Sequence, residues 1–183
     1  MRIVSGKHKS RRITAPKNLP VRPTTDMAKE ALFNIINNQY YFDQISALDL
    51  FAGIGSISFE FASRGTTQVT SVDQNHGCIK FLNKINKELE FENQIIKSDV
   101  YSFLERTNKK FDVIFADPPY DFPIEQFQKI ITLVFEKQLL EEDGMLIIEH
   151  SKQTKLSENS TFIKSKKYGG NMFSFFENSS TEE

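Results

Sequence analysis

The chain has few of the features that mark exported, membrane-embedded or metal-stabilised proteins. Its single cysteine, Cys78, excludes an internal disulfide framework and a Cys-built zinc site, which fits a reducing compartment. No apolar run approaches the roughly 18 residues that a membrane span requires, and basic rather than apolar residues follow Met1–Ser5. His8, His76 and His150 lie far apart without paired ligand spacing. We therefore expect a cytoplasmic protein with no membrane partner and no metal.

Acidic residues are absent from the first 25 positions, which makes the charge distribution uneven. The 183 residues carry a formal net charge of −1, yet residues 1–25 hold seven Lys or Arg, leaving −8 on the remainder. Clustered positive charge is typical of nucleic-acid binding, because each neutralised phosphate releases condensed counterions. Alternating apolar and polar residues in Met1–Ser5 and Arg12–Ala15 predict a hairpin whose basic tip, at Gly6–Lys9, is held out from the core. The residues expected to contact the RNA backbone are Lys7, Lys9, Arg11, Arg12 and Arg22.

From residue 45 onward, short apolar strands alternate with amphipathic helices. The strands are expected at Ile45–Phe51, Gln68–Asp73, Gln94–Ser98, Phe111–Ala116 and Gly144–His150. Helices are expected near residues 55–64, 75–90, 99–107 and 123–138, and after a Thr24 or Thr25 cap. This alternation predicts a parallel sheet with helices on both faces. Tyr168-Gly169-Gly170 leaves no room for a helix between Thr161–Lys167 and Asn171–Phe176, so the closing pair is antiparallel.

A loop with two glycines follows the first strand of the expected sheet. Ligands of open parallel sheets bind at the carboxyl ends of the strands, near the point where the strand order reverses. In Asp49–Gly55, the glycines Gly53 and Gly55 allow a tight turn and a close approach of backbone to ligand. No Gly-Lys-Ser/Thr follows, and Ser58 stands where the third glycine of the dinucleotide fingerprint belongs. A phosphate ligand is therefore disfavoured.

Two aspartates end the next two strands. Asp73, which lies 20 residues after Gly53, is placed to accept hydrogen bonds from both hydroxyls of a ribose. Asp99, at the end of the following strand, can accept from an adenine amino group. Either aspartate alone is better explained as a helix cap. The ordered series of glycine turn, Asp73 and Asp99 indicates an adenosine bound without a phosphate-gripping lysine.

The sequence Asp117-Pro118-Pro119-Tyr120 follows the fourth strand. Two prolines fix the backbone and cannot continue the sheet, which leaves the Asp117 side chain and the Pro118 carbonyl free to face a ligand. Two fixed acceptors would hold the exocyclic amine of a nucleobase toward an electrophile, while Tyr120 offers a face for stacking. The alternative is a rigid turn with an incidentally buried tyrosine.

Together, Asp49–Gly55 and Asp117–Tyr120 resemble the two hallmark motifs of class I S-adenosylmethionine-dependent methyltransferases that act on amino nitrogens. Arg22–Asp26, Glu30–Asn34, Arg64-Gly65 and the basic N-terminal segment make the chain similar to the bacterial 16S ribosomal RNA guanine-N2 methyltransferase family, called RsmD. The resemblance implies a Rossmann-like α/β fold: a seven-stranded, mostly parallel sheet with an antiparallel terminal strand, and a small N-terminal β-hairpin. It divides the chain into an RNA-binding arm (1–22), a methyltransferase domain (23–177) and a disordered acidic tail (178–183).

The resemblance also implies an activity and assigns roles. A monomer would transfer a methyl group from S-adenosylmethionine to guanine N2 in the P-site region of 16S rRNA, on an assembled or partly assembled small subunit, releasing S-adenosylhomocysteine. The implied cofactor-binding residues are Asp49, Phe51, Gly53, Gly55, Asp73, Asp99 and Val100; the implied catalytic residues are Asp117, Pro118, Pro119 and Tyr120. Because Asp-Pro-Pro-Tyr also occurs in adenine-N6 enzymes of DNA or RNA, that substrate is an alternative. A non-catalytic RNA-binding protein of ribosome assembly is another.

Overall fold

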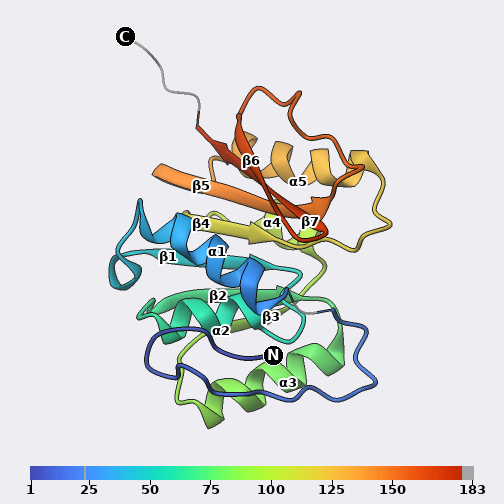
Figure 1. Cartoon of the computed structure of the whole chain (residues 1–183). Helices are drawn as coiled ribbons and strands as arrows, with labels where there is room; N and C mark the ends of the chain where they lie inside the picture. Colours follow the sequence, from blue (N-terminus) through green and yellow to red (C-terminus); the bar gives the residue numbers. More distant parts are fainter. Residues whose placement is uncertain (23, 179–183) are drawn as a thin grey trace.

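A seven-stranded sheet organises the computed structural model, which describes residues 1–22 and 24–178 (Figure 1). The strands are β1 (Ser46–Leu50), β2 (Gln68–Asp73), β3 (Gln94–Lys97), β4 (Phe111–Ala116), β5 (Leu140–Ser151), β6 (Phe162–Tyr168) and β7 (Asn171–Glu177). Their order is β3-β2-β1-β4-β5-β7-β6. The first five pair in parallel, and β7 is antiparallel to both β5 and β6. The antiparallel closing pair predicted from the sequence is confirmed.

Helices cover both faces of the sheet. They are α1 (Asp26–Asn37), α2 (Ser56–Ser63), α3 (His76–Glu88), α4 (Val100–Arg106) and α5 (Ile124–Glu136), with a short 3-10 helix at Phe42–Gln44. Figure 1 shows α1 and α2 in front of the sheet and α5 behind it. The start of α1 follows the local rule, because the Thr25 hydroxyl accepts a hydrogen bond from the Ala28 N–H and Asp26 lies in the first turn.

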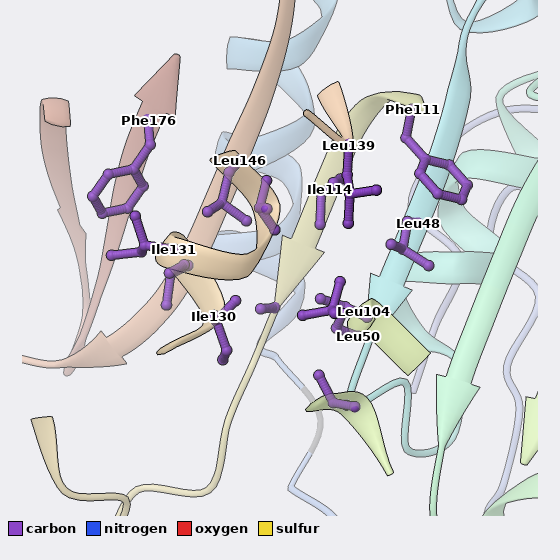
Figure 2. Packing of buried hydrophobic residues seen from close by; sticks show 14 of the residues in the cluster. Leu48, Leu50, Leu104, Phe111, Ile114, Ile130, Ile131, Leu139, Leu146 and Phe176 are labelled. Carbon is purple, nitrogen blue, oxygen red and sulfur yellow. The ribbon is translucent and has the colours of Figure 1, made fainter. Parts of the chain in front are cut away.

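Alternating strand residues send apolar side chains to both faces, so the sheet is buried on both sides. In β1, Leu48 and Leu50 pack toward α4 and α5, whereas Ala47 packs toward α1 and α2. Figure 2 shows Leu48 and Leu50 beside Ile114 and Leu104. Burying each such side chain stabilises the fold by about 1.5–3 kcal/mol. This core holds the strand ends, and hence the loops after them, in fixed positions.

The N-terminal segment is packed against the domain. Arg2 and Arg12 form an antiparallel bridge, and Ile3 and Ile13 are buried in a cluster with residues of α2 and α3. The predicted pairing of the two segments is therefore present. The expectation that the basic tip is held out from the core is wrong, because the Lys7 N–H donates to the Ser63 carbonyl of α2 over 2.7 Å.

Two contacts explain why the tip lies against α2. A Cβ on Gly6 would stand 1.8 Å from the Ser63 carbonyl oxygen, so the missing side chain permits this close approach. The buried Glu60 carboxylate accepts hydrogen bonds from the backbone N–H groups of Val4 and Ser5, at 2.9 and 3.0 Å. Glu60 also forms an ion pair with Lys29. Burial lowers the pKa of Lys29. A buried carboxylate needs such partners, and the tip of the segment supplies two of them.

Several element boundaries differ from the sequence-based expectation, most of them by one or two residues. β5 begins at Leu140 rather than Gly144, because its ladder with β4 extends to the Phe111–Leu140 pair after a register shift. Glu177 ends β7, and of the predicted acidic tail only Asn178 belongs to the described residues. Within the described residues, no helix combines the length and apolar character that crossing a bilayer requires.

Candidate active site

One cavity of about 910 Å³ opens at the carboxyl ends of β1, β2 and β4. This volume lies within the range of ligand and cofactor pockets. The predicted site residues that line it are Asp49, Phe51, Gly53, Asp73, Asp99, Val100, Arg22 and all four residues of Asp117–Tyr120. Gly55 and the arm residues Lys7, Lys9, Arg11 and Arg12 do not line it. The structure thus brings both motifs to one space, at the edge of the sheet where the sequence placed them.

The loop after β1 turns through three left-handed backbone positions. Phe51, Gly53 and Gly55 have φ values of 61°, 56° and 83°. At Gly55 a Cβ would stand 2.5 Å from the Phe59 ring and 2.7 Å from Leu82, so this glycine permits the loop to pack on α2 and α3. Gly53 instead faces the cavity with an exposed stretch of backbone. The two glycines therefore have different positions, one behind the loop and one on the cavity wall.

Asp49 anchors the start of α2 beneath this loop. One of its carboxylate oxygens accepts from the Ser58 N–H at 3.0 Å and from the Ser58 hydroxyl at 2.5 Å. Burial raises the pKa of Asp49 to about 7, although both Ser58 hydrogen bonds lower it. Ser58, which disqualifies the dinucleotide fingerprint, is thus the residue that holds Asp49 in place.

Asp73 and Asp99 hold local backbone N–H groups and line the cavity as well. The two oxygens of Asp73 accept from the Gly53 and Asn75 N–H groups, each at 2.8 Å. Asp99 begins α4 by accepting from the Ser102 N–H at 2.9 Å. An ionised carboxylate has about four acceptor positions, so both side chains keep acceptors for a ligand. For Asp99, the capping and ligand interpretations are therefore compatible, whereas the capping interpretation of Asp73 is wrong, because Asn75 caps α3.

Asp117–Tyr120 forms the opposite wall of the cavity. The Asp117 N–H donates to the Leu50 carbonyl at 3.4 Å, which joins the loop to the end of β1. Burial, with the negative charges of Glu149 and Asp49, raises the pKa of Asp117 well above its usual range. The Tyr120 side chain is 49% exposed and so presents a ring at the mouth of the cavity.

Behind Tyr120 lies a hydrogen-bond chain that sequence reasoning missed. The Tyr120 hydroxyl donates to the Asn171 amide oxygen at 2.7 Å, and the Asn171 amide nitrogen donates to Glu149 at 2.6 Å. The other Glu149 oxygen accepts from the Thr24 hydroxyl at 2.9 Å. Burial raises the pKa of Glu149 although both partners lower it. One signal was available, because a glutamate directly after the apolar run Met145–Ile148 is unusual in a buried strand.

The basic arm residues lie in three situations. Arg11 pairs with Glu88 at 2.6 Å and Arg2 pairs with Asp26 at 2.9 Å, so two of the seven arm cations have partners within the chain. Lys7, Lys9 and Arg12 lie exposed on the surface. Arg22 lies over the Tyr120 ring, 5.8 Å from its centroid, and reaches the cavity.

A metal centre has no ligand set in the described part of the chain. Over residues 1–22 and 24–178, no group of three or more His, Cys, Asp or Glu side chains could hold a metal ion. The charged and polar side chains of the cavity include four aspartates, Arg22, Lys97, Gln74 and Asn75. The site therefore offers hydrogen-bond acceptors and an apolar wall rather than a coordination sphere.

The sheet order, the reversed β7 and the loop after β1 define the Rossmann-like fold of class I methyltransferases. The solved Escherichia coli protein yhhF superposes with a TM-score of 0.84 over 96% of each chain, at 22% identity. The Thermus thermophilus 16S rRNA N2 G1207 methyltransferase RsmC, solved with AdoMet and guanosine, gives 0.69 over 87% of this chain and 45% of that one, at 20% identity. These likenesses confirm the fold class.

Sequence relatives and a family model extend this result. The Bacillus subtilis protein YlbH is 37% identical over 163 residues, which cover 86% of either chain. Ribosomal RNA small subunit methyltransferase D of Haemophilus influenzae is 30% identical over 185 residues, covering 97% of this chain and 94% of that one. The model described as conserved hypothetical protein 95 matches residues 1–177. The chain belongs to this family, the RsmD family of methyltransferases.

Proposed function

We propose that the protein transfers a methyl group from S-adenosylmethionine to the exocyclic N2 of a guanine in the P-site region of 16S rRNA. We place the reaction on an assembled or partly assembled small subunit and expect the enzyme to act as a monomer. The observation that carries the proposal is one cavity lined both by Gly53, Asp73 and Asp99 and by Asp117–Tyr120. Relatives named small subunit methyltransferase D support an rRNA substrate.

The cavity suits the proposed methyl donor in size and in its hydrogen-bonding groups. It is lined by four aspartates, Arg22 and Lys97, so acceptor oxygens can face the hydroxyl and amino groups of the donor. Asp73 would hold the ribose, Asp99 and Val100 the adenine, and the Phe51–Gly53 backbone the methionine portion. When bound, S-adenosylmethionine supplies an electrophilic methyl group, so the protein needs to position the acceptor rather than activate the donor.

Asp117 and the Pro118 carbonyl form the acceptor wall. Each can accept a hydrogen bond from an N–H of the exocyclic amine, which fixes the nitrogen toward the donor side and favours a localised lone pair. The Asp117 carboxyl accepts whether or not it is protonated. After the new C–N bond forms, the cationic amine gives one proton to the Asp117 carboxylate or to water.

The Tyr120 ring would stack on the face of the target base. The target nucleotide must leave its stack to enter a pocket of this kind, and stacking on an aromatic side chain returns about 1–3 kcal/mol. The hydrogen bond to Asn171 fixes the ring from behind, and Arg22 lies over it.

Labelled-methyl transfer to small subunits from cells that lack this gene tests the proposal. The product is digested to nucleosides, and the modified position is mapped; large subunits serve as the control. We expect N2-methylguanine at one position of 16S rRNA. N6-methyladenine would establish the alternative substrate, and donor binding without any transfer would favour the non-catalytic alternative.

A further inference from the structure

Positive charge gathers on a second surface, far from the N-terminal arm. Residues 151–168 hold five lysines and one acid, within a part of the chain that is otherwise acidic. They belong to the end of β5, the loop after it and β6, which is the edge strand of the sheet. The arm packs on α2 and α3, toward the β3 edge (Figure 1). Six strand spacings of about 4.8 Å place the two basic regions on the order of 30 Å apart.

Two of these lysines, Lys152 and Lys167, lie next to each other. Both are exposed, and direct contact with Lys167, together with its charge, lowers the pKa of Lys152. In residues 1–22 and 24–178, neither lysine takes part in an ion pair. Two adjacent ammonium groups repel each other, so a bound anion between them is favourable.

The strand register places this lysine pair at the carboxyl edge of the sheet, the edge at which the cavity opens. Asn171 is paired with Ser151 of β5 and with Tyr168 of β6, and each lysine is one residue from these positions. Asn171 accepts the hydrogen bond from the Tyr120 hydroxyl at 2.7 Å. Because successive strand residues point to opposite faces, Lys167 projects from the face of the sheet opposite to Asn171. The lysine pair and the Tyr120 ring, on which we propose that the target base stacks, therefore lie on different faces of the sheet but at the same carboxyl edge.

The end of the β6–β7 hairpin is open to a large partner. A Cβ placed on Gly169 or Gly170 would have no atom within 4 Å, so the turn faces free space. The turn adjoins Tyr168 and Asn171, at the same edge of the sheet as Asp117–Tyr120. The turn itself therefore leaves room for a partner at this edge of the sheet.

We infer that Lys152 and Lys167 bind backbone phosphates of the RNA strand that carries the target nucleotide. This inference rests on the proposed function, which makes the substrate RNA. The strand then follows the carboxyl edge of the sheet from the lysine pair to the target base at Tyr120, where Arg22 at the end of the arm reaches the cavity. Contacts to phosphate set the position of the strand and do not read its sequence. Because Arg2 and Arg11 are paired with acids, the arm has fewer free cations than its sequence suggests.

Salt-dependent binding to a short single-stranded RNA oligonucleotide tests the inference. For the variant Lys152→Ala/Lys167→Ala, we expect the slope of log affinity against log salt to become shallower by about 1.4, since each phosphate contact on a single strand contributes about 0.7. The matched control is Lys109→Ala/Lys110→Ala, which removes two exposed lysines just before β4, at the opposite edge of the sheet. Thermal unfolding of both variants establishes that they fold.

The outcomes separate this inference from the proposed function. A wild-type slope in the Lys152/Lys167 variant, or an equal loss in the control, overturns the lysine pair as a phosphate site even if the enzyme methylates guanine. A shallower slope in that variant alone, with no methyl transfer to any RNA, keeps the phosphate site and overturns the proposed function. The expected result is a shallower slope in that variant alone, with a lower methylation rate at sub-saturating small subunits and unchanged donor affinity.

Discussion

The two walls of the cavity are built in different ways. We call the side with Gly53, Asp73 and Asp99, which we propose binds the methyl donor, the donor wall. There, the Gly53 N–H donates a hydrogen bond to Asp73, 20 residues away, and Asp99 caps the helix that directly follows it. On the acceptor wall, Tyr120 contacts Asn171 across 51 positions, and Thr24 contacts Glu149 across 125. The donor wall is therefore a series of local turns at successive strand ends, whereas the acceptor wall exists only after β5, β7 and the segment before α1 have come together.

This difference suggests how the two walls divide the work. A wall made of local turns presents the same hydrogen-bond acceptors as soon as its neighbouring strands have paired. Such a wall suits a ligand that never changes. A wall assembled from distant segments depends on the position of each segment. It can therefore link the position of the Asp117–Tyr120 loop to the regions that we propose contact RNA. The variants below test this division, from the largest expected effect to the smallest.

Replacing Asp117 by Ala should have the largest effect. Loss of the acceptor that holds the amine should lower kcat by about 10²–10³-fold, while calorimetry should find the donor affinity nearly unchanged. Asp117→Asn keeps an acceptor oxygen and should lie between Ala and wild type; activity as low as that of Ala would show that the proton-accepting role dominates. The control is Asp121→Ala, an exposed carboxylate four residues further on. Near wild-type turnover in Asp117→Ala would refute the assignment.

Asp49→Asn should change the pH dependence of stability. With a pKa of about 7 in the folded protein and about 3.9 in the unfolded chain, Asp49 holds a proton that the unfolded chain has lost between those values. Its contribution to stability is therefore fully present below about pH 4 and is lost as the pH rises to about 7, with roughly 1.4 kcal/mol per pH unit and about 4 kcal/mol in total.

Denaturant unfolding of wild type and Asp49→Asn across that range measures this difference. The variant carries a permanently neutral side chain that can still accept from Ser58, so its stability should fall less steeply than that of wild type. Glu149, whose pKa is also raised, remains in both proteins, and its share largely cancels in the comparison. Removing the Asp49 charge takes away one cause of the raised pKa of Asp117, which flattens the curve of the variant further in the same direction. Parallel curves for the two proteins would contradict the raised pKa of Asp49.

Asp73→Ala should weaken donor binding by about 10–100-fold, because charge-assisted hydrogen bonds contribute about 1.5–3 kcal/mol. Titration calorimetry with S-adenosylmethionine measures this effect, and kcat at saturating donor should change little. Asp73→Glu preserves the carboxylate and should bind within several-fold of wild type. An effect on kcat alone would place Asp73 on the acceptor wall and break the comparison.

Asn171→Ala should have the smallest effect, about a tenfold loss of kcat/KM for the RNA substrate at constant donor affinity. The variant frees the Tyr120 ring and leaves Glu149 with one partner, a cost of about 1–3 kcal/mol in stability. Tyr120→Phe breaks the same link from the other side while it keeps the ring. In the double variant the two losses in kcat/KM should not add, because both remove one interaction. Full additivity would show that Asn171 does not act through Tyr120.

Much of the fold was predictable because its signals are local. The apolar runs that became β1, β2 and β4, and the Thr25 cap of α1, were visible in the sequence, and the structure confirms them. The N-terminal tip was not predictable in the same way. Its basic residues suggest that it projects into solvent. Instead it packs on α2, because Gly6 permits the close approach and because Glu60 and Ser63, more than 50 residues away, accept its backbone hydrogen bonds.

By itself, the sequence determined the order of strands and helices, the glycine loop with Asp73 and Asp99, and the rigid Asp117–Tyr120 corner. Each of these depends on residues close together in the chain, whose backbone preferences act over a few positions. Only the tertiary structure decided that Thr24, Glu149 and Asn171 support Tyr120, and that Lys152 meets Lys167. Those contacts join strands and loops that are far apart in the chain, and only the pairing register of β5, β6 and β7 fixes which side chains meet.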